Sequence, residues 1–251
     1  MKVIILSAGQ GRRLLPYTKE APKCLVPIQG RPLLAWQIDA LRRCGVEDIT
    51  VVVGFMADAV EAKLAELYGE NSIRTLFNPF FDVADNLISC WVAREEMRED
   101  FMLLNGDTLF ELAVPKRLLA APAHPVTLAV SRKDHYDGDD MKVIREGDRL
   151  VRVGKTLPLD QVNAESIGMM CFRGDGPRLF RAALERAVRD PRALKQWYLS
   201  LIDSLADTGV VWTQPIWDLG WTEVDCPADL RRATAPGSPW LLCTEISAVQ
   251  A

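Results

Sequence analysis

A glycine-containing loop near the start of the chain carries residue types that bind phosphate. Residues 7–13 read SAGQGRR and follow a short apolar stretch. Two glycines and a small alanine let the backbone turn its N–H groups toward an anion, while Arg13 supplies charge and a planar fork of donors. Residues 1–31 hold six Lys or Arg side chains against Glu20 alone, although the whole chain has a net charge of −4. Positive charge is thus concentrated where a polyphosphate would bind.

A single lysine lies between two prolines shortly after this loop. Lys23 stands in the segment APKCLVPI, in which Pro22 and Pro27 restrict the backbone. We expect its ammonium group to be held in place. Two other phosphate-binding motifs are excluded, because a dinucleotide fingerprint needs a third small residue where Leu14 stands and a Walker loop needs a GK[ST] sequence.

Two aspartates are candidate ligands for a hard divalent cation. Asp107 follows a short apolar stretch and Gly106, so it lies where a buried strand would end. Asp225 stands in the sequence EVDCP. Carboxylate oxygens are the ligands that Mg²⁺ prefers. Each aspartate also has a structural interpretation, because Asp107 could shape a turn and Asp225 could cap a helix that begins at Pro227.

The hydrophobic pattern of the first 105 residues alternates between strands and helices. It predicts strands at 2–7, 48–54, 72–77 and 101–105, with helices at 31–44, 57–68 and 85–97 between them. This alternation is typical of an α/β fold in which helices cover both faces of a parallel sheet. Ligands of such sheets bind beyond the carboxyl ends of the strands, where residues 7–13 lie.

The second half of the chain has a different pattern. It predicts strands at 126–131, 167–172 and 210–214, a hairpin formed by 142–144 and 150–153, and helices at 176–189 and 194–207. We predict one domain over residues 1–234, with halves at 1–112 and 113–234, followed by a tail at 235–251.

Composition and charge exclude several classes of protein. With 49% hydrophobic and 25% charged residues, the chain can bury a large core. Its negative net charge disfavours broad nucleic-acid binding. No apolar run approaches the roughly 18 residues of a membrane span, and none resembles a signal peptide, so we expect no membrane insertion and a cytoplasmic location. Six cysteines, at positions 24, 44, 90, 171, 226 and 243, form no CxxC pair. We therefore expect reduced, mostly buried thiols rather than a zinc site.

Several segments together resemble a known family of enzymes. LSAGQGRRLLPYT at 6–18, APKCLVPI at 21–28 and GRPLLAWQIDAL at 30–41 look like the signature of nucleotidyltransferases that couple a nucleoside triphosphate to a phosphorylated small molecule. The resemblance continues through NGDTLF, ESIGMMCF and GWTEVDCPADLRRA to about residue 233. It implies a Rossmann-like, mixed and mainly parallel sheet flanked by helices, of the nucleotide-diphospho-sugar transferase type. It also implies Mg²⁺ or another divalent cation, a nucleotide-binding half at 1–112 and a hairpin-containing, acceptor-binding half at 113–234.

Within this superfamily, the hairpin DDMKVIREGDRLVRVGK and the segment WTEVDCPADL are most similar to the bacterial phosphocholine cytidylyltransferase branch. The resemblance implies that CTP reacts with a small phosphorylated or phosphonylated amine or alcohol. A sugar-1-phosphate nucleotidyltransferase that uses UTP, dTTP or GTP stays open as an alternative. A noncatalytic nucleotide-binding regulatory subunit is a second alternative, although it would be expected to have lost Lys23 or Asp107.

The same resemblance implies roles for individual residues. It assigns catalysis to Lys23, Arg13 and Asp107, and the metal to Asp107 and Asp225. The predicted nucleotide contacts are Leu6, Ala8, Gly9, Gln10, Gly11, Arg12, Arg13, Lys23 and Gly106. The predicted acceptor contacts are Asp85, Asn86, Lys142, Lys155, Glu165, Tyr198 and Trp221.

The acceptor side keeps several interpretations open. Aromatic faces can hold a quaternary ammonium group, and several tryptophans lie in stretches that the family uses near its acceptor. Aromatic residues at such spacing are more often part of the core. Asp85 stands where relatives often carry asparagine, and it could meet an amine on the acceptor or cap a helix. Lys142, Lys155 and Glu165 could equally be ordinary surface charges, and the sequence does not decide whether two copies of the chain form a homodimer.

Overall fold

The structure, a computed structural model, describes residues 1–240. Its first half forms a parallel sheet from β1 (Lys2–Leu6), β4 (Ile49–Val53), β5 (Arg74–Phe77) and β6 (Phe101–Asn105), in the order β5-β4-β1-β6. The connecting helices are α1 (Leu33–Arg42), α2 (Ala57–Tyr68) and α3 (Asn86–Val92). The predicted alternation of strands and helices is confirmed in this half.

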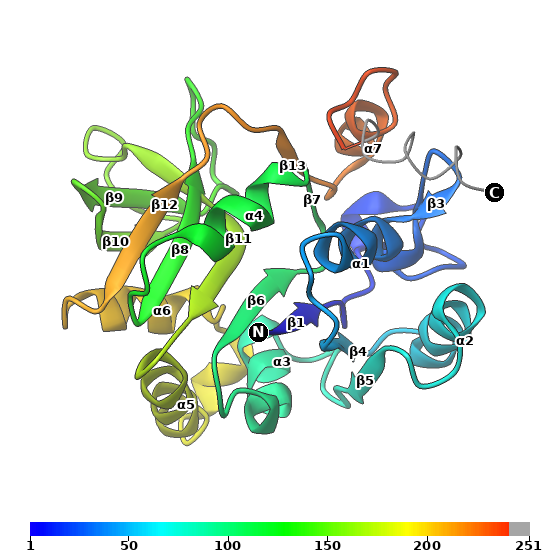
Figure 1. Cartoon of the computed structure of the whole chain (residues 1–251), viewed down its shortest axis with the longest axis horizontal. Coiled ribbons are helices and arrows are strands. Elements are labelled where there is room, and N and C mark those ends of the chain that lie inside the picture. Colours follow the sequence, from blue (N-terminus) through cyan, green and yellow to red (C-terminus); the bar gives the residue numbers. More distant parts are fainter. Residues whose placement is uncertain (241–251) are drawn as a thin grey trace.

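The second half extends the same sheet in mixed orientation. β11 (Ala164–Phe172) runs antiparallel to β6 and to β8 (Val126–Ser131), and β12 (Val211–Pro215) runs parallel to β8. The hairpin of β9 (Lys142–Glu146) and β10 (Arg149–Gly154) follows: β10 pairs with β12, and β9 pairs back with β11. Figure 1 shows these strands lying beside the first-half strands. The remaining helices are α4 (Ala113–Ala120), α5 (Gly176–Ala187), α6 (Leu199–Ala206) and α7 (Pro227–Ala233).

Alternate side chains of the central strands enter two different cores. On β1, Ile4 and Leu6 pack in a cluster with residues of α3, α5 and α6. Val3 and Ile5 enter a second cluster with residues of α1, α2 and α4. The strand is therefore buried on both faces, which explains its continuous apolar sequence.

A third, smaller core joins the start of the chain to its end. Leu14 and Val26, which flank Lys23 in sequence, are fully buried in a cluster with Val224 and Leu230 of α7. Two short sheets lie nearby: β2 (Pro27–Ile28) pairs with β3 (Arg31–Pro32), and β7 (Thr108–Phe110) pairs with β13 (Trp221–Glu223). This packing holds the residue-23 segment against the residue-225 segment.

Several predicted boundaries need correction. The predicted helix at 85–97 ends at Val92 and continues as a 3₁₀ turn over Ala93–Glu96, and the helix at 194–207 begins only at Leu199. The 3₁₀ turn Pro191–Lys195 and the elements β7 and α4 were not predicted. A proline inside a predicted helix usually argues against that helix. Pro115, however, lies in the first turn of α4, where proline is tolerated.

The five cysteines among the described residues are buried or half-buried. Within residues 1–240 no disulfide forms: Cys24, Cys90 and Cys171 are buried, and Cys44 and Cys226 are half-buried. Position 243 and most of the predicted tail lie outside the described residues. No helix of the described part is long and apolar enough to cross a bilayer.

Candidate active site

The glycine loop closes directly onto Lys23. Gly11 has a φ of 75° and starts a 3₁₀ turn at Arg12–Leu14. A Cβ on Gly11 would lie 2.7 Å from the Cβ of Lys23, so any larger residue would push the lysine away. The buried Thr18 closes the loop, because its Oγ1 donates a hydrogen bond of 2.8 Å to the carbonyl oxygen of Gly11. Glycine is therefore required here both by conformation and by close approach.

The ammonium group of Lys23 lies between two carboxylates. Its Nζ is 2.8 Å from Oδ2 of Asp107 and also pairs with Oδ1 of Asp225. Burial by itself lowers the pKa of Lys23, but the two carboxylates outweigh this effect and the pKa is raised. Lys23 is therefore a positioned cation, held by two carboxylates.

Strand pairing brings the two aspartates together. β13 pairs with β7 so that Glu223 lies opposite Thr108, and the backbone N–H of Val224 donates to the carbonyl oxygen of Asp107 at 3.0 Å. The side chain of Asp225 does not cap the helix that follows it. Asp229 does so instead, because its Oδ2 accepts from the backbone N–H groups of Asp225 and Cys226, at 3.0 and 2.8 Å. The side chain of Asp225 faces the site.

Arg13 extends this arrangement toward the second half of the chain. Its Nη2 donates to Oδ2 of Asp225 at 2.8 Å, and its Nη1 donates to Oδ2 of Asp139 at 2.7 Å. Oδ1 of Asp139 lies 3.3 Å from Nζ of Lys155. Charges alternate along the resulting ion-pair chain, which runs Lys155, Asp139, Arg13, Asp225, Lys23, Asp107.

Three cavities meet at Arg13 and Asp225. The loop cavity, of about 430 Å³, is lined by Gly9, Gly11 and Lys23 among others. The inner cavity, of about 130 Å³, contains Lys155 and the partly exposed Trp197 in its wall. The outer cavity, of about 690 Å³, reaches to Glu165 and Trp221. Of the predicted site residues, the loop cavity is lined by Leu6, Gly9, Gly11, Arg12, Arg13, Lys23, Asp85, Asn86, Gly106, Asp107 and Asp225.

Four predicted site residues do not line these cavities. Ala8 is buried, and Gln10 accepts a hydrogen bond from Arg12 at 3.3 Å. Lys142 is buried, and its Nζ donates to the carbonyl oxygens of residues 137, 140 and 155. A phosphate contact would require these bonds to break, so the geometry gives Lys142 a loop-anchoring role. Tyr198 is fully buried, and its hydroxyl donates to Oδ1 of Asn105 at 3.0 Å.

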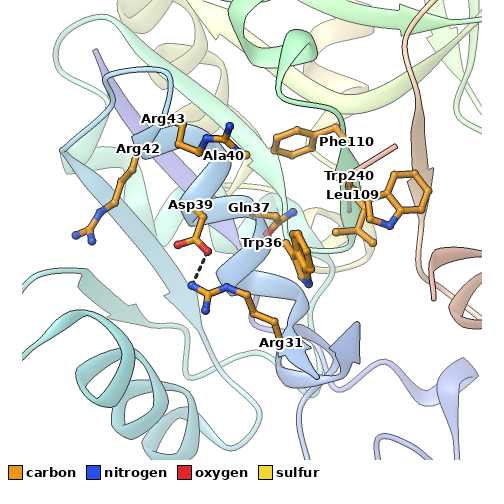
Figure 2. A pocket seen from close by; sticks show the side chains of 10 residues that line it. All are labelled: Arg31, Trp36, Gln37, Asp39, Ala40, Arg42, Arg43, Leu109, Phe110 and Trp240. Carbon is orange, nitrogen blue, oxygen red and sulfur yellow. Dashed lines mark ion pairs between the residues drawn. The ribbon is translucent and has the colours of Figure 1, made fainter. Parts of the chain in front are cut away.

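The turn that carries Asp107 is held from behind by α1. Nε2 of Gln37 donates to the carbonyl oxygens of Asn105 and Thr108, both at 2.8 Å, and so brackets residues 106 and 107. Gln37 also lines a separate cavity of about 440 Å³ beside α1, shown in Figure 2 with Trp36 and Trp240 on its wall. None of the predicted site residues lines that cavity. In sequence, Gln37 appears only as a member of the apolar stripe of a helix, which gives no hint of this role.

Two further acidic residues were missed. Glu223 lines the inner and outer cavities, and desolvation together with the nearby carboxylates of Asp107 and Asp225 raises its pKa to about 8. Asp139 was missed because its partners lie far away in sequence: Arg13 is 126 residues distant. The segment EVD contains Glu223 in an alternating strand pattern with Asp225, a signal that could have found it.

The carboxylates fit a hard divalent cation of the kind that the resemblance implies. Oδ1 of Asp107 is buried without a hydrogen-bond partner, so this oxygen is available to bind a cation. Within residues 1–240, no three His, Cys, Asp or Glu side chains form a metal-binding group by themselves. Mg²⁺ commonly takes one or two carboxylates and completes its shell with water and substrate phosphates. Asp107 and Asp225 are the residues that would hold it.

The arrangement as a whole suits phosphoryl chemistry. The loop cavity combines three basic side chains with three carboxylates, so it is close to neutral until a metal and a polyphosphate arrive together. None of the residues is arranged as a nucleophile with an adjacent base. Positioning and charge neutralisation are the contributions that this geometry can make.

Most of the chain matches a known protein family. A family model described as the MobA-like NTP transferase domain matches residues 3–204. The chain is 32% identical over 249 residues to a CMP-5′-(3-aminopropyl)phosphonate synthase of Streptomyces rubellomurinus, covering 95% of this chain and 39% of that protein. It is 35% identical over 111 residues to the choline-phosphate cytidylyltransferase of Streptococcus pneumoniae, covering 44% of this chain and 47% of that protein. The chain thus spans less than half the length of these curated relatives.

The fold is shared with a solved structure. The inositol-1-phosphate CTP transferase from T. maritima superposes with a TM-score of 0.80 at 24% sequence identity, over 100% of this chain and 97% of that one. This likeness confirms the mixed α/β fold of the nucleotide-diphospho-sugar transferase type. Because the matching family model extends over most of the chain, the protein belongs to the family of MobA-like NTP transferase domains.

Proposed function

We propose that the protein is a divalent-metal-dependent cytidylyltransferase. It joins the CMP portion of CTP to a small phosphorylated or phosphonylated acceptor and releases pyrophosphate. An oxygen of the acceptor attacks the α-phosphorus of CTP, and the bond from that phosphorus to the bridging oxygen of pyrophosphate breaks. No covalent intermediate with the protein is needed.

One observation carries this proposal: the glycine loop, Lys23 and two carboxylates converge in a single cavity. Gly11 touches Lys23, and Lys23 pairs with Asp107 and Asp225. Two polyanions that react must first overcome their mutual repulsion, and a fixed ammonium group beside a metal site supplies the required positive charge. A bound Mg²⁺ would add charge neutralisation at the transferred phosphoryl group.

Residue roles follow from the cavities. In this proposal the backbone N–H groups of Gly9 and Gly11 and the side chain of Arg13 face the triphosphate, while Lys23 contacts the α-phosphate and the incoming acceptor oxygen. Lys155, in the wall of the inner cavity, contacts the phosphate or phosphonate of the acceptor. These assignments place the nucleotide in the loop cavity and the acceptor in the inner cavity.

The choice of CTP is supported by the relatives. Their names include a CMP-phosphonate synthase, a choline-phosphate cytidylyltransferase and a CTP:phosphoglutamine cytidylyltransferase. All three acceptors join a nitrogen-containing group to a phosphate or phosphonate. A noncatalytic subunit is disfavoured because Lys23 and Asp107 are both present and in contact.

A substrate screen tests the proposal. The purified protein is incubated with Mg²⁺, one of CTP, UTP, dTTP or GTP, and a panel of small phosphates, phosphonates and sugar 1-phosphates, and pyrophosphate release is measured. We expect turnover with CTP and a small non-sugar acceptor. Turnover with dTTP or UTP and a sugar 1-phosphate, without turnover of CTP, would contradict the proposal.

A further inference from the structure

We propose that Asp139 selects the acceptor by binding its positively charged nitrogen once substrate phosphates have displaced it from Arg13 and Lys155. The inference rests on the proposed function and narrows it. The acceptor class it names is a phosphate or phosphonate that carries an ammonium group with N–H donors. No sequence motif singles out Asp139.

The ion-pair chain leaves Asp139 without a partner when substrates bind. In that chain, Asp139 connects Arg13 to Lys155, at 2.7 and 3.3 Å. Both cations are assigned to substrate phosphates, so both exchange Asp139 for a phosphate oxygen. Asp107 and Asp225 remain beside Lys23 and would also hold the metal, whereas Asp139 pairs with neither Lys23 nor the metal. Its negative charge is then left beside the acceptor.

The loop that carries Asp139 is built to present this side chain. Oδ1 of Asp137 accepts hydrogen bonds from the backbone N–H groups of Asp139 and Asp140, at 2.8 and 3.2 Å. Lys142 anchors the base of the loop through three carbonyl oxygens. The side chain of Asp139 remains 69% exposed. Exposed ion pairs are weak, so phosphates can replace this carboxylate without disturbing the loop.

The balance of charge around the acceptor favours a cation. Asp139 lines both the inner and the outer cavity, and acidic side chains outnumber basic ones in the lining of each. An acceptor phosphate adds further negative charge to the same space. An ammonium group on the acceptor restores the balance, whereas a neutral hydroxyl does not.

Two of the tryptophans in this region are already paired with cations. Nζ of Lys155 lies 4.4 Å from the ring centroid of Trp197, and the guanidinium of Arg132 lies 4.3 Å from that of Trp217. Asp85, the other carboxylate considered for an amine, lines the loop cavity and neither of the other two. Asp139 is therefore better placed than Asp85 to receive the acceptor nitrogen.

Matched acceptors test this inference. Wild-type protein and Asp139→Asn are assayed with CTP, Mg²⁺ and two isosteric pairs: 2-aminoethyl- with 2-hydroxyethylphosphonate, and 3-aminopropyl- with 3-hydroxypropylphosphonate. We expect the wild type to prefer the amine of a pair in kcat/KM. In Asp139→Asn, kcat/KM for the amine should fall about 10-fold or more, because a charge-assisted hydrogen bond is lost. The value for the alcohol should fall much less than the value for the amine.

Two further variants make the outcome specific. Asp134→Asn removes the same charge from an exposed position of the same loop that lines neither cavity, and it should leave the amine preference intact. Asp139→Glu keeps the charge and should retain part of the preference. An equal change for amine and alcohol in Asp139→Asn, or a wild-type preference for alcohols, overturns the inference while the cytidylyltransferase remains. Absence of CTP turnover with every acceptor overturns the proposed function, and the inference falls with it.

Discussion

The loop cavity and the inner cavity are assembled from very different parts of the sequence. In the loop cavity, Gly11 and Lys23 are twelve positions apart and touch each other across a tight turn. The inner cavity joins Asp139 and Lys155 of the second half to Arg13 of the first. A local segment with a close glycine–lysine contact forms one wall of the loop cavity. Ion pairs between partly exposed side chains shape the inner cavity. The inner cavity can therefore be altered to suit a different acceptor while the loop cavity is kept.

Removing Lys23 tests the first cavity most severely. Lys23→Ala deletes the positioned cation, and we expect kcat with the best acceptor to fall by about 10³-fold, a loss typical of removing a preorganised charge. Thermal unfolding and circular dichroism should show a folded protein. Lys19→Ala, an exposed lysine of the same region, is the control and should retain activity. Near-normal turnover of Lys23→Ala would refute the assigned role.

Asp107→Ala should reduce turnover by about 10²-fold or more, since a metal ligand is lost while Asp225 remains. The Mg²⁺ concentration for half-maximal activity should also increase. A magnesium titration of initial rates measures both effects. If the titration midpoint does not change, Asp107 does not hold the metal and the loop cavity works through Lys23 alone.

Gly11→Ala changes the backbone conformation and packing of the loop cavity without removing a charge. A Cβ at Gly11 meets the Lys23 side chain and forces a non-glycine residue into a left-handed conformation, which costs about 1–2 kcal/mol. We expect a lower melting temperature and a loss of turnover of about 10-fold or more by displacement of Lys23. Gly9→Ala, where a Cβ would meet nothing within 4 Å, should be less harmful to stability. Equal melting temperatures of the two variants would contradict this geometry.

The smallest effect concerns Glu165, at the outer cavity. Desolvation raises its pKa, although Lys133 partly opposes this. The folded protein then holds this proton to higher pH than the unfolded chain does. Its contribution to stability is therefore fully present below pH 4.5, its ordinary value, and is lost as pH rises through the folded pKa. Glu165→Gln abolishes this dependence.

Thermal unfolding measures that difference. The melting temperature of Glu165→Gln minus that of the wild type should be more positive at pH 7 than at pH 4.5, by roughly 2–4 °C for each kcal/mol involved. The exposed Glu185→Gln serves as the control and should show no such trend. An identical difference at both pH values would show that Glu165 titrates normally.

The sequence predicts most of the scaffold because long, strongly patterned elements determine it. The boundaries of α2, β6 and β8 agree with the prediction at both ends. β7 is only three residues long and follows Asp107 directly, so no periodicity reveals it. Its pairing with β13 nevertheless brings Asp225 to Lys23.

Some residues of the site are likewise visible in the sequence, and others are not. Gly11, Lys23 and Asp107 lie in recognisable motifs, and the structure brings them together. Asp139 and Gln37 act through long-range contacts that a single sequence does not display. Lys142 and Tyr198 carry the right chemistry for an acceptor site, but burial and hydrogen bonding commit them to the scaffold.

A crystal structure with Mg²⁺ and a nonhydrolysable CTP analogue tests the central claim most directly. We expect the α-phosphate within hydrogen-bond distance of Lys23 Nζ, about 3 Å, and the β- and γ-phosphates near the backbone N–H groups of Gly9 and Gly11. Asp107 and Asp225 are the residues that would hold the Mg²⁺. A nucleotide bound elsewhere, with Gly11 and Lys23 remote from every phosphorus atom, would contradict the account.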